Sequence, residues 1–452
     1  MILPASGFLI GLVLHAVSAS VTLRKTSRGP TGYEVDFSYF NATATNVTVG
    51  GGLYPFTDEF HTSTGAAASY DPHSYKPGWF PSVGSTSTFP RPYSMSSDGK
   101  GNWNYTTPLP SGTYSYAFLV DCANVTLCTV NSTQYVIDFQ NPPFVNVPGD
   151  QIQSTFQVPY DPKFQYYPDM GLQFDYALPV VKQHRGSIST VNYTSPGSIH
   201  PAPDVHDFAL YLPEEYGACG SKKYPLLYLS HGSGGNGEDW ENLAQVSNIL
   251  DALILAKYIP PTVVVMPSFY NLAPEYQFTY GVAGSVAPSV SYVRENYMKY
   301  LFPWVQSHYN VSRDPSMRAF AGLSLGSVLT YEMYINATGY FDYYGMFSGA
   351  LGPFATPSAY INSNTTAANP GLIGKGLFTG AGLYDIAFGD VRSLQTALDT
   401  LKIPHVSRIA PYGFHYWNTW QDLLWHFGQK ALWQSLPFNT STGLYIPQSP
   451  IM

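Results

Sequence analysis

Charged side chains are scarce in this sequence. They make up 11% of its 452 residues, and the formal net charge is −8. No cluster of Lys and Arg, and no stripe that combines Arg with aromatic rings, is available to neutralise a phosphate backbone, so binding to nucleic acid has little support. Aromatic residues, by contrast, reach 16%. This balance favours a neutral, polyhydroxylated or aromatic ligand over a polyanion.

Cysteine is almost absent, with three residues in the whole chain. Cys122 and Cys128 flank a short turn, and we expect them to close a hairpin disulfide in an oxidising compartment. Cys219 is then left unpaired. Because no motif surrounds Cys219, we interpret it as an unreactive loop residue rather than as a nucleophile.

The apolar run near the start of the chain, residues 7–17, is too short for a good membrane span. Small residues follow at 18–19, where a signal peptidase would read them. We therefore predict a signal peptide over residues 1–19 and a secreted protein with no membrane partner; the alternative is a buried N-terminal helix. Ten glycosylation sequons agree with secretion: Asn41, Asn46, Asn104, Asn124, Asn131, Asn192, Asn310, Asn336, Asn364 and Asn439.

The N-terminal part of the chain, residues 20–141, has short runs of alternating apolar and polar residues that are broken by Gly, Asn and Pro. This pattern predicts a small all-β sandwich. Its stretch from Gly112 to Asp121 resembles a strand of the early-set sandwiches of the glycogen-binding-module family. Trp79, Trp103 and Tyr105 are candidates for a sugar-stacking platform, although a core or interface role is the more common one.

The rest of the chain changes character. Residues 142–176 lack periodicity and are expected to form a connector. From 177 to 438, short apolar runs alternate with helical stretches, which predicts a doubly wound α/β sheet, and 439–452 is a tail. The expected buried strands are residues 225–230, 262–266, 318–321, 376–379 and 406–409.

A Gly-x-Ser-x-Gly motif covers Gly322 to Gly326 and lies between a predicted strand and a predicted helix. This is the setting of a nucleophile elbow, where the two glycines permit a sharp turn that exposes the serine hydroxyl. We therefore predict that Ser324 is a catalytic nucleophile.

A serine nucleophile needs a histidine to take its proton. His405 opens a predicted strand and His426 lies in a predicted amphipathic helix, so both are expected to be packed or solvated. His415 lies between that strand and that helix, at the carboxyl edge of the sheet. We predict that His415 is the general base.

The histidine in turn needs a carboxylate. Asp385 follows a predicted strand at the same edge as Ser324 and His415, and we favour it over Asp390; its alternative role is to cap a helix. The developing oxyanion needs backbone N–H donors. Leu325 is one expected donor, and Ser233, in the turn His231-Gly232-Ser233-Gly234-Gly235, is the other. His231 is expected to brace this turn.

Taken together, these motifs resemble carbohydrate esterase family one, the esterase D-like family of feruloyl, acetylxylan and enterochelin esterases. The resemblance spans residues 179–435 and rests on the elbow and on five further segments: 211–213, 224–232, 238–240, 382–385 and 415–420. The sequence departs from the family pattern at two places: Ser327 stands where members commonly have a second glycine, and Gly413-Phe414-His415 lacks the usual second glycine before the histidine. The resemblance implies an α/β-hydrolase fold and a Ser-His-Asp triad, and Trp240 and Trp417 are candidate substrate contacts.

No metal or cofactor is expected. The sequence has no His-Glu-x-x-His, and the segment with His200, Asp204, His206 and Asp207 suits a structural loop better than a metal site. The predicted function is that of a secreted esterase acting on feruloyl or acetyl esters of plant-cell-wall polysaccharide. A siderophore esterase or general carboxylesterase is the alternative within the enzyme class. A non-catalytic glycan-binding protein is the alternative outside it.

Overall fold

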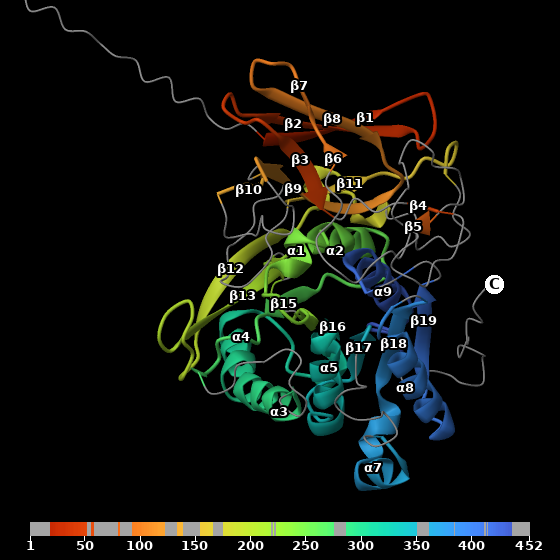
Figure 1. Ribbon diagram of the computed structural model, residues 1–452. Coiled ribbons are helices and arrows are strands. Elements are labelled where there is room, and N and C mark those ends of the chain that lie inside the picture. Colours follow the sequence, from red (N-terminus) through yellow and green to blue (C-terminus); the bar gives the residue numbers. More distant parts are fainter. Residues whose placement is uncertain are drawn as a thin grey trace, which may run out of the picture.

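The structure is a computed structural model. It describes residues 19–51, 56–57, 80–81, 93–122, 133–138, 154–165, 175–217, 220, 223–274, 286–349, 361–383, 385–410, 413 and 415–435. Residues 1–18 of the predicted signal peptide, Trp79, Cys128, Cys219 and the tail at 439–452 lie outside these ranges. Figure 1 shows an all-β domain stacked on an α/β domain.

The β-domain consists of antiparallel strands in two main sheets. One sheet has the order β1-β2-β8-β7, and the other has the order β10-β9-β3-β6, with β11 also paired to β9. A separate pair is formed by β4 and β5. The strands are β1 (Ala19–Lys25), β2 (Tyr33–Phe40), β3 (Val47–Gly51), β4 (Phe56–Thr57), β5 (Phe80–Pro81), β6 (Tyr93–Ser94), β7 (Ser96–Ser97), β8 (Asn102–Pro108), β9 (Gly112–Val120), β10 (Tyr135–Val136) and β11 (Ser154–Val158).

Alternation along these strands builds the core between the two sheets. In β2, the first, third, fifth and seventh residues are buried and the others are half-buried, as the period of two requires. Trp103 and Tyr105 of β8 belong to this arrangement: Trp103 is 7% exposed, and Tyr105 packs against the same apolar cluster. Of the three candidate platform residues, these two therefore serve the core.

Strand β11 was not anticipated from the sequence, because it lies within the region expected to be a connector. Residues 154–158 pair with residues 112–116 of β9 and so extend the second sheet. The reason is visible in the burial of the segment, since four of its five residues are buried. The β-domain therefore continues beyond residue 141, and part of the link to the α/β domain is itself a strand.

The α/β domain is built on an eight-stranded sheet with the order β12-β13-β15-β14-β16-β17-β18-β19. From β15 to β19 the neighbours are parallel, whereas β12 and β13 are antiparallel additions at one edge. The strands are β12 (Ser187–Thr194), β13 (Val205–Leu212), β14 (Leu226–Ser230), β15 (Val263–Pro267), β16 (Arg318–Leu323), β17 (Tyr343–Phe347), β18 (Gly376–Gly382) and β19 (His405–Ala410). The predicted α/β class with a preceding all-β domain is confirmed.

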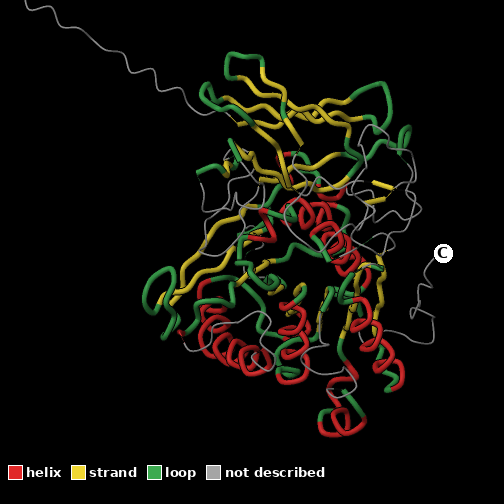
Figure 2. Tube along the Cα trace, in the orientation of Figure 1, coloured by secondary structure: helices red, strands yellow, loops and turns green. Residues whose placement is uncertain are grey.

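Helices cover both faces of this sheet (Figure 2). One face carries α1 (Asp239–Asn242), α2 (Val246–Leu255) and α9 (Trp417–Lys430), and the β-domain lies beyond them. The other carries α3 (Val286–Asn296), a π-helical turn (Tyr297–Leu301), α4 (Phe302–His308), α5 (Leu325–Asn336) and α8 (Phe388–Thr400). Helix α7 (Ser363–Ala368) lies in the link from β17 to β18, and short 3-10 turns are found at Asp175–Ala177, Lys182–His184, Pro315–Met317 and Pro370–Gly374.

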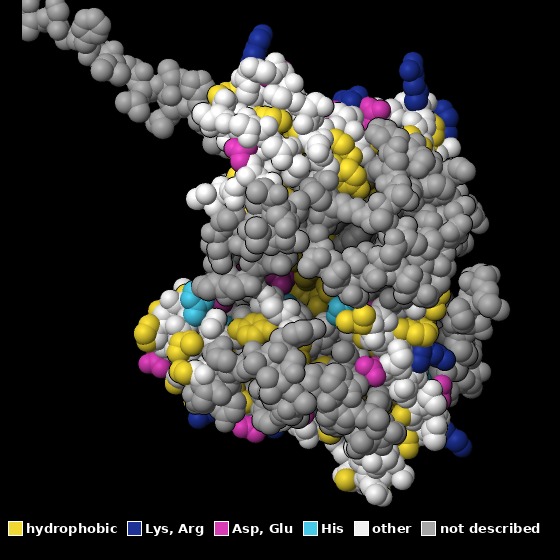
Figure 3. Space-filling view, in the orientation of Figure 1, with side chains coloured by type: hydrophobic (Ala, Val, Ile, Leu, Met, Phe, Trp, Pro, Cys, Tyr) yellow, Lys and Arg dark blue, Asp and Glu magenta, His cyan; other side chains and the backbone are white. Residues whose placement is uncertain are grey.

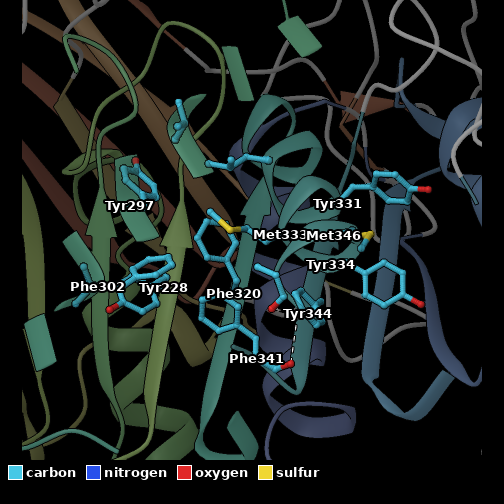
Figure 4. Close-up of a cluster of buried hydrophobic side chains, with 14 of the residues drawn as sticks. Tyr228, Tyr297, Phe302, Phe320, Tyr331, Met333, Tyr334, Phe341, Tyr344 and Met346 are labelled. Atoms are coloured by element: carbon cyan, nitrogen blue, oxygen red, sulfur yellow. Dashed lines mark hydrogen bonds between the residues drawn. The ribbon is translucent and has the colours of Figure 1, made fainter. Parts of the chain in front are cut away.

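The larger apolar cluster of the α/β domain is rich in aromatic rings (Figure 4). Tyr228 of β14 packs on Phe302 of α4 with 4.4 Å between the ring centroids, and Phe341 contacts Phe320 of β16 edge-on at 5.7 Å. Aromatic pairs in these geometries add to the free energy of burial. This cluster fixes α3 to α5 against the sheet and so holds the strand ends in place.

The described surface is sparsely charged, as the composition requires. On the face in Figure 3, Lys and Arg side chains stand singly rather than in one patch. Among the helices of the described ranges, none has the length and apolar character needed to cross a bilayer.

Candidate active site

Four parallel strands end at the same edge of the sheet and deliver the predicted site residues there. Strand β14 ends at Ser230 before the glycine-rich turn, and β16 ends at Leu323, directly before Ser324. Strand β18 leads to Asp385 and β19 leads to His415. Because carboxyl ends of parallel strands meet at one edge, residues far apart in the sequence come together.

Ser324 occupies a sharp turn between β16 and α5. Its backbone lies at φ 50° and ψ −116°, a region that costs a non-glycine residue of order 1–3 kcal/mol. Both flanking glycines are required by close backbone approach. A Cβ on Gly322 would lie 2.5 Å from the Gly326 carbonyl oxygen, and one on Gly326 would lie 2.2 Å from that of His231. The elbow predicted from the motif is therefore present.

His415 lies within reach of the serine. Its Nε2 is 2.9 Å from Ser324 Oγ, and its side chain is 21% exposed, so a substrate can approach while the ring stays ordered. The ring packs edge-on against Trp420 of α9, with 5.2 Å between centroids. Helix α9 begins at Trp417, two residues after His415, and its first turns therefore set the position of the imidazole.

Asp385 completes the set. Its Oδ1 lies 2.8 Å from His415 Nδ1, and its side chain is fully buried. The same oxygen accepts the backbone N–H of Ala387 at 2.8 Å, which fixes the turn before α8; the N-cap of α8 is Ala387, so Asp385 does not have the helix-capping role that was its alternative. Gly382 and Gly413 bring the two loops together, because a Cβ on Gly382 would lie 2.1 Å from the Gly413 carbonyl carbon. Since a carboxylate only accepts, Nδ1 carries the imidazole proton and Nε2 is free to take one from Ser324.

The glycine-rich turn lies against the elbow. A Cβ on Gly232 would be 3.3 Å from Ser324 Cβ, and Ser233 is exposed beside it. Leu325 opens α5, so its N–H has no acceptor within the helix. Leu325 therefore adjoins Ser324 in the chain, and the turn that contains Ser233 approaches the elbow through Gly232.

His231 braces this turn from below. It is fully buried and stacks on Phe269 at 4.0 Å between centroids. Burial lowers the pKa of its imidazole to about 3, so the ring is neutral. Its Nδ1–H donates to the Gly232 carbonyl at 2.7 Å. In a trans peptide the carbonyl and the next N–H point in opposite directions, so this bond turns the N–H of Ser233 away from His231.

Two residues that support the site were not singled out from the sequence: Tyr270, which bonds the glycine-rich turn, and Trp420, which packs on His415. The hydroxyl of Tyr270 accepts the N–H of Gly234 at 2.8 Å, and Tyr270 follows shortly after β15 at the same sheet edge. Its position after a buried strand was a usable signal. Trp420, beside His415, had no such signal, because one aromatic in an amphipathic helix looks like any other.

The expectation that Trp240 and Trp417 contact substrate is wrong in this structure. Trp240 is 0% exposed and Trp417 is 9% exposed, and the two rings pack edge-on at 5.5 Å. The indole N–H of Trp240 donates to the Ser230 carbonyl at 3.0 Å. Both tryptophans therefore lie beneath the site, where they support the strand end that precedes the turn.

The remaining candidates have ordinary partners. His405 is buried, bonds the Ile403 carbonyl through Nδ1 and has a pKa lowered by burial. His426 bonds the Asp422 carbonyl within α9. His206 bonds the Tyr270 carbonyl through Nε2, and no group of three or more metal-binding side chains occurs within the described ranges. Cys122 is disulfide-bonded, with its partner outside those ranges.

Comparison with known proteins agrees with this site. Residues 204–375 match the family described as "Putative esterase". The matched range includes the glycine-rich turn and Ser324, whereas Asp385 and His415 follow it.

Two curated relatives are similar to part of this chain. The endo-1,4-beta-xylanase/feruloyl esterase of Xylanibacter ruminicola is 32% identical over 147 residues, which are 31% of this chain and 19% of the relative. The endo-1,4-beta-xylanase Y of Acetivibrio thermocellus is 26% identical over 235 residues, which are 46% of this chain and 20% of the relative. The chain therefore spans about a fifth of the length of these relatives.

A solved structure shares the two-domain fold. The enterobactin esterase FES of Shigella flexneri, in the presence of 2,3-di-hydroxy-N-benzoyl-serine, superposes with a TM-score of 0.54 and 15% identity, covering 91% of this chain and 96% of that chain. At this identity the likeness concerns the fold alone.

Proposed function

We propose that this protein is a secreted serine esterase that hydrolyses feruloyl or acetyl esters on plant-cell-wall polysaccharide. The observation that carries the esterase assignment is the continuous chain of contacts from Ser324 Oγ through His415 to Asp385, at 2.9 and 2.8 Å, beside the glycine-rich turn that contains Ser233. A serine hydroxyl becomes a nucleophile when a base is within this reach.

In the first half of the reaction, Ser324 Oγ attacks the ester carbonyl while His415 Nε2 takes the hydroxyl proton. Asp385 stabilises the imidazolium and keeps its orientation. The carbonyl oxygen becomes an oxyanion, which the N–H groups of Leu325 and Ser233 receive; a single donor of this kind is worth about 10²–10³ in kcat. The intermediate collapses, His415 gives its proton to the departing alcohol, and an acyl-enzyme is left.

In the second half, water attacks the acyl-enzyme while His415 takes its proton. The second tetrahedral intermediate expels Ser324 Oγ, which regains a proton from the imidazolium. The products are a carboxylic acid and the free alcohol. No cofactor takes part in these steps.

The substrate class is supported by the relative from Xylanibacter ruminicola, whose name combines a xylanase with a feruloyl esterase. It is also supported by composition: a chain with 16% aromatic and 11% charged residues suits a neutral sugar or phenolic ester better than a charged one.

The nucleophile is tested by Ser324→Ala. This variant should lose hydrolysis of methyl ferulate by at least roughly 10³-fold and keep the wild-type melting temperature. Labelling of the wild-type protein with a phosphonate, followed by peptide mapping, should find the modification on Ser324. Unchanged turnover in the variant would refute the assignment, and an unlabelled Ser324 in a protein that binds xylan would favour a glycan-binding protein without catalysis.

The substrate is tested by a panel of methyl ferulate, acetylated xylan and a catecholate trilactone. We expect activity on the first two. Activity on the trilactone alone would replace the polysaccharide assignment by a siderophore esterase.

Secretion is tested separately by expressing the full chain in a eukaryotic host and sequencing the N-terminus of the protein in the medium. The expected first residue is Ser20. Retention of the protein in the cell with residues 1–19 intact would contradict export.

A further inference from the structure

The β-domain contacts the helix that follows His415. Helix α9 presents Asn418 and Gln421, one turn apart, to strand β9, where Thr113 is the contact residue. The N–H of Thr113 donates to Asn418 Oδ1 at 3.1 Å, and its hydroxyl donates to Gln421 Oε1 at 2.6 Å. Thr113 is 2% exposed and Gln421 is 0% exposed, so water does not compete for these bonds.

These bonds belong to a longer directional chain. Gln157 of β11, which is paired with Thr113 across the two strands, donates through Nε2 to the Thr113 hydroxyl. Gln421 passes the chain on, because its Nε2 donates to the Ala244 carbonyl at 2.7 Å. The Thr113 hydroxyl and the Gln421 amide are thus each used as donor and acceptor. Removing one member would leave buried partners unsatisfied, at a cost of about 1–3 kcal/mol each.

Strand β11 also contacts an element behind the glycine-rich turn, residues 231–235. Thr155 of β11 donates to the Asn242 carbonyl at the end of α1 at 2.7 Å. Two residues earlier in α1, Trp240 holds the Ser230 carbonyl, immediately before the turn that contains Ser233. The β-domain therefore bonds to the two segments that position the base and the oxyanion donors.

The opposite side of α9 is fixed to the sheet. Asp422, next to Gln421, makes a two-pronged ion pair with Arg408 of β19 at 2.9 and 3.0 Å, and the two side chains are 0% and 4% exposed. Successive residues of a helix point about 100° apart. Gln421 therefore holds α9 from the β-domain side while Asp422 holds it from the sheet side.

We propose that the β-domain is a working part of the active site and that Thr113 is a positioning residue for His415. By fixing the first turns of α9, Thr113 sets the distance from His415 to Ser324. This inference rests on the proposed esterase function. It assigns the β-domain a task within the reaction, whereas a separate sugar-binding module would be dispensable for the chemical step.

The test compares full-length variants at position 113. Thr113→Val keeps the shape of the side chain but removes the hydroxyl. We expect kcat for p-nitrophenyl acetate to fall about tenfold, with KM within a factor of two of wild type, because small displacements of a base reduce the chemical step rather than binding. The rate of phosphonate labelling of Ser324 should fall in parallel. Thr113→Ser, which restores the hydroxyl, should recover both rates.

Two further variants separate positioning from folding. Thr106→Val removes a hydroxyl from the outer face of the same domain, where it bonds Asp36, and should leave kcat unchanged. Gln157→Met removes only one donor to Thr113 and keeps the helix contact, so it should fold even if Thr113→Val does not, and kcat should fall about threefold. A Thr113→Val protein, or its Gln157→Met substitute, with wild-type kcat and a lower melting temperature would overturn the proposal.

A proton NMR measurement keeps this inference distinct from the proposed function. The proton on His415 Nδ1 is held by Asp385 and is expected to give a downfield resonance that vanishes in His415→Gln. If the wild-type protein hydrolysed no ester, the esterase proposal would fall, yet this resonance would still report on the imidazole. Its displacement in Thr113→Val supports the positioning role, and an unchanged resonance contradicts it.

Discussion

In strand β2 of the β-domain every second residue is partly exposed, whereas all six residues of β16 in the α/β domain are buried. The outer face of the β-domain can therefore carry solvated ion pairs such as that of Arg24 with Asp36 and Glu34. The sheet of the α/β domain is covered on both faces, so an unpaired polar group on its strands costs free energy. Its chemistry gathers instead where the strands end.

This difference between the domains predicts which polar substitution lowers kcat most. In the α/β domain the proposed catalytic carboxylate, Asp385, lies just beyond a strand end, and its loss should be the largest effect. Asp385→Asn should lower kcat about 10⁴-fold with little change in unfolding free energy, because an amide no longer enforces the His415 tautomer that leaves Nε2 free. Steady-state hydrolysis of p-nitrophenyl acetate measures the change.

Asp390→Asn is the matched control for this prediction, since Asp390 was the competing candidate in the sequence. It lies in the first turn of α8 and should change kcat by less than a factor of two. A large loss at Asp390 together with a small one at Asp385 would reverse the assignment.

The two domains should also differ in what their arginines contribute. Arg408 is buried with Asp422, so Arg408→Met removes the two-pronged partner of a buried carboxylate and leaves it with the 3.4 Å contact to His426 Nδ1; the free energy of unfolding should fall by about 3–5 kcal/mol. Arg24 makes its ion pairs on the exposed face, and Arg24→Met should leave the denaturation midpoint unchanged. Urea unfolding followed by tryptophan fluorescence compares the two. Equal midpoints would mean that the Arg408 pair is not as isolated from water as its burial indicates.

Neighbouring residues within one strand allow the burial of the two sheets to be compared directly. In β2, Phe37→Ala should cost about 3–5 kcal/mol, whereas Ser38→Ala, on the partly exposed face, should change the stability little. In β14, Leu227 and Tyr228 point to opposite faces but are both 0% exposed, so both alanine variants should be strongly destabilised. Chemical denaturation of the four variants measures these changes in the free energy of unfolding. Similar losses at Phe37 and Ser38 would contradict the one-sided burial of β2.

The sequence predicts the parts of the site that depend on local geometry. Gly322 and Gly326 indicate the elbow, because only glycine permits the close backbone contacts made there. His415 and Asp385 follow from their places after predicted strands, since the edge of a parallel sheet gathers such residues. The elbow, His415 and Asp385 could be located without knowledge of packing.

What the sequence could not supply is the direction of side chains that are decided by tertiary contacts. Trp240 lies near the oxyanion turn in sequence, yet its ring faces inward to Trp417 because the space beneath Ser230 needs a large apolar group. Likewise, Thr113 and Gln421 are 308 residues apart, and neither has a motif around it. Strand β11 was missed because its pairing with β9 compensates for weak local signals.

The last expected effect concerns the buried histidine of the glycine-rich turn, His231. Burial lowers the pKa of His231 to about 3 in the folded protein, from 6.5 for an exposed imidazole. Below pH 6.5 the unfolded chain takes up a proton that the folded protein refuses, so stability falls as the pH drops from about 6.5 toward 3. The slope from this group approaches about 1.4 kcal/mol per pH unit. Urea unfolding at a series of pH values measures it.

His231→Asn isolates this contribution. The amide can replace the Nδ1–H bond to the Gly232 carbonyl but takes up no proton. Between pH 6.5 and 4, the free energy of unfolding of the variant should therefore fall less steeply with decreasing pH than that of the wild type, by the contribution of one proton. His308→Asn, at the exposed end of α4, should keep the wild-type slope. If His231→Asn had the same pH dependence as the wild type, then His231 would be protonated in the fold. Its Nε2 would then be a donor facing the backbone N–H of Phe269, an arrangement that the observed 3.4 Å contact does not permit.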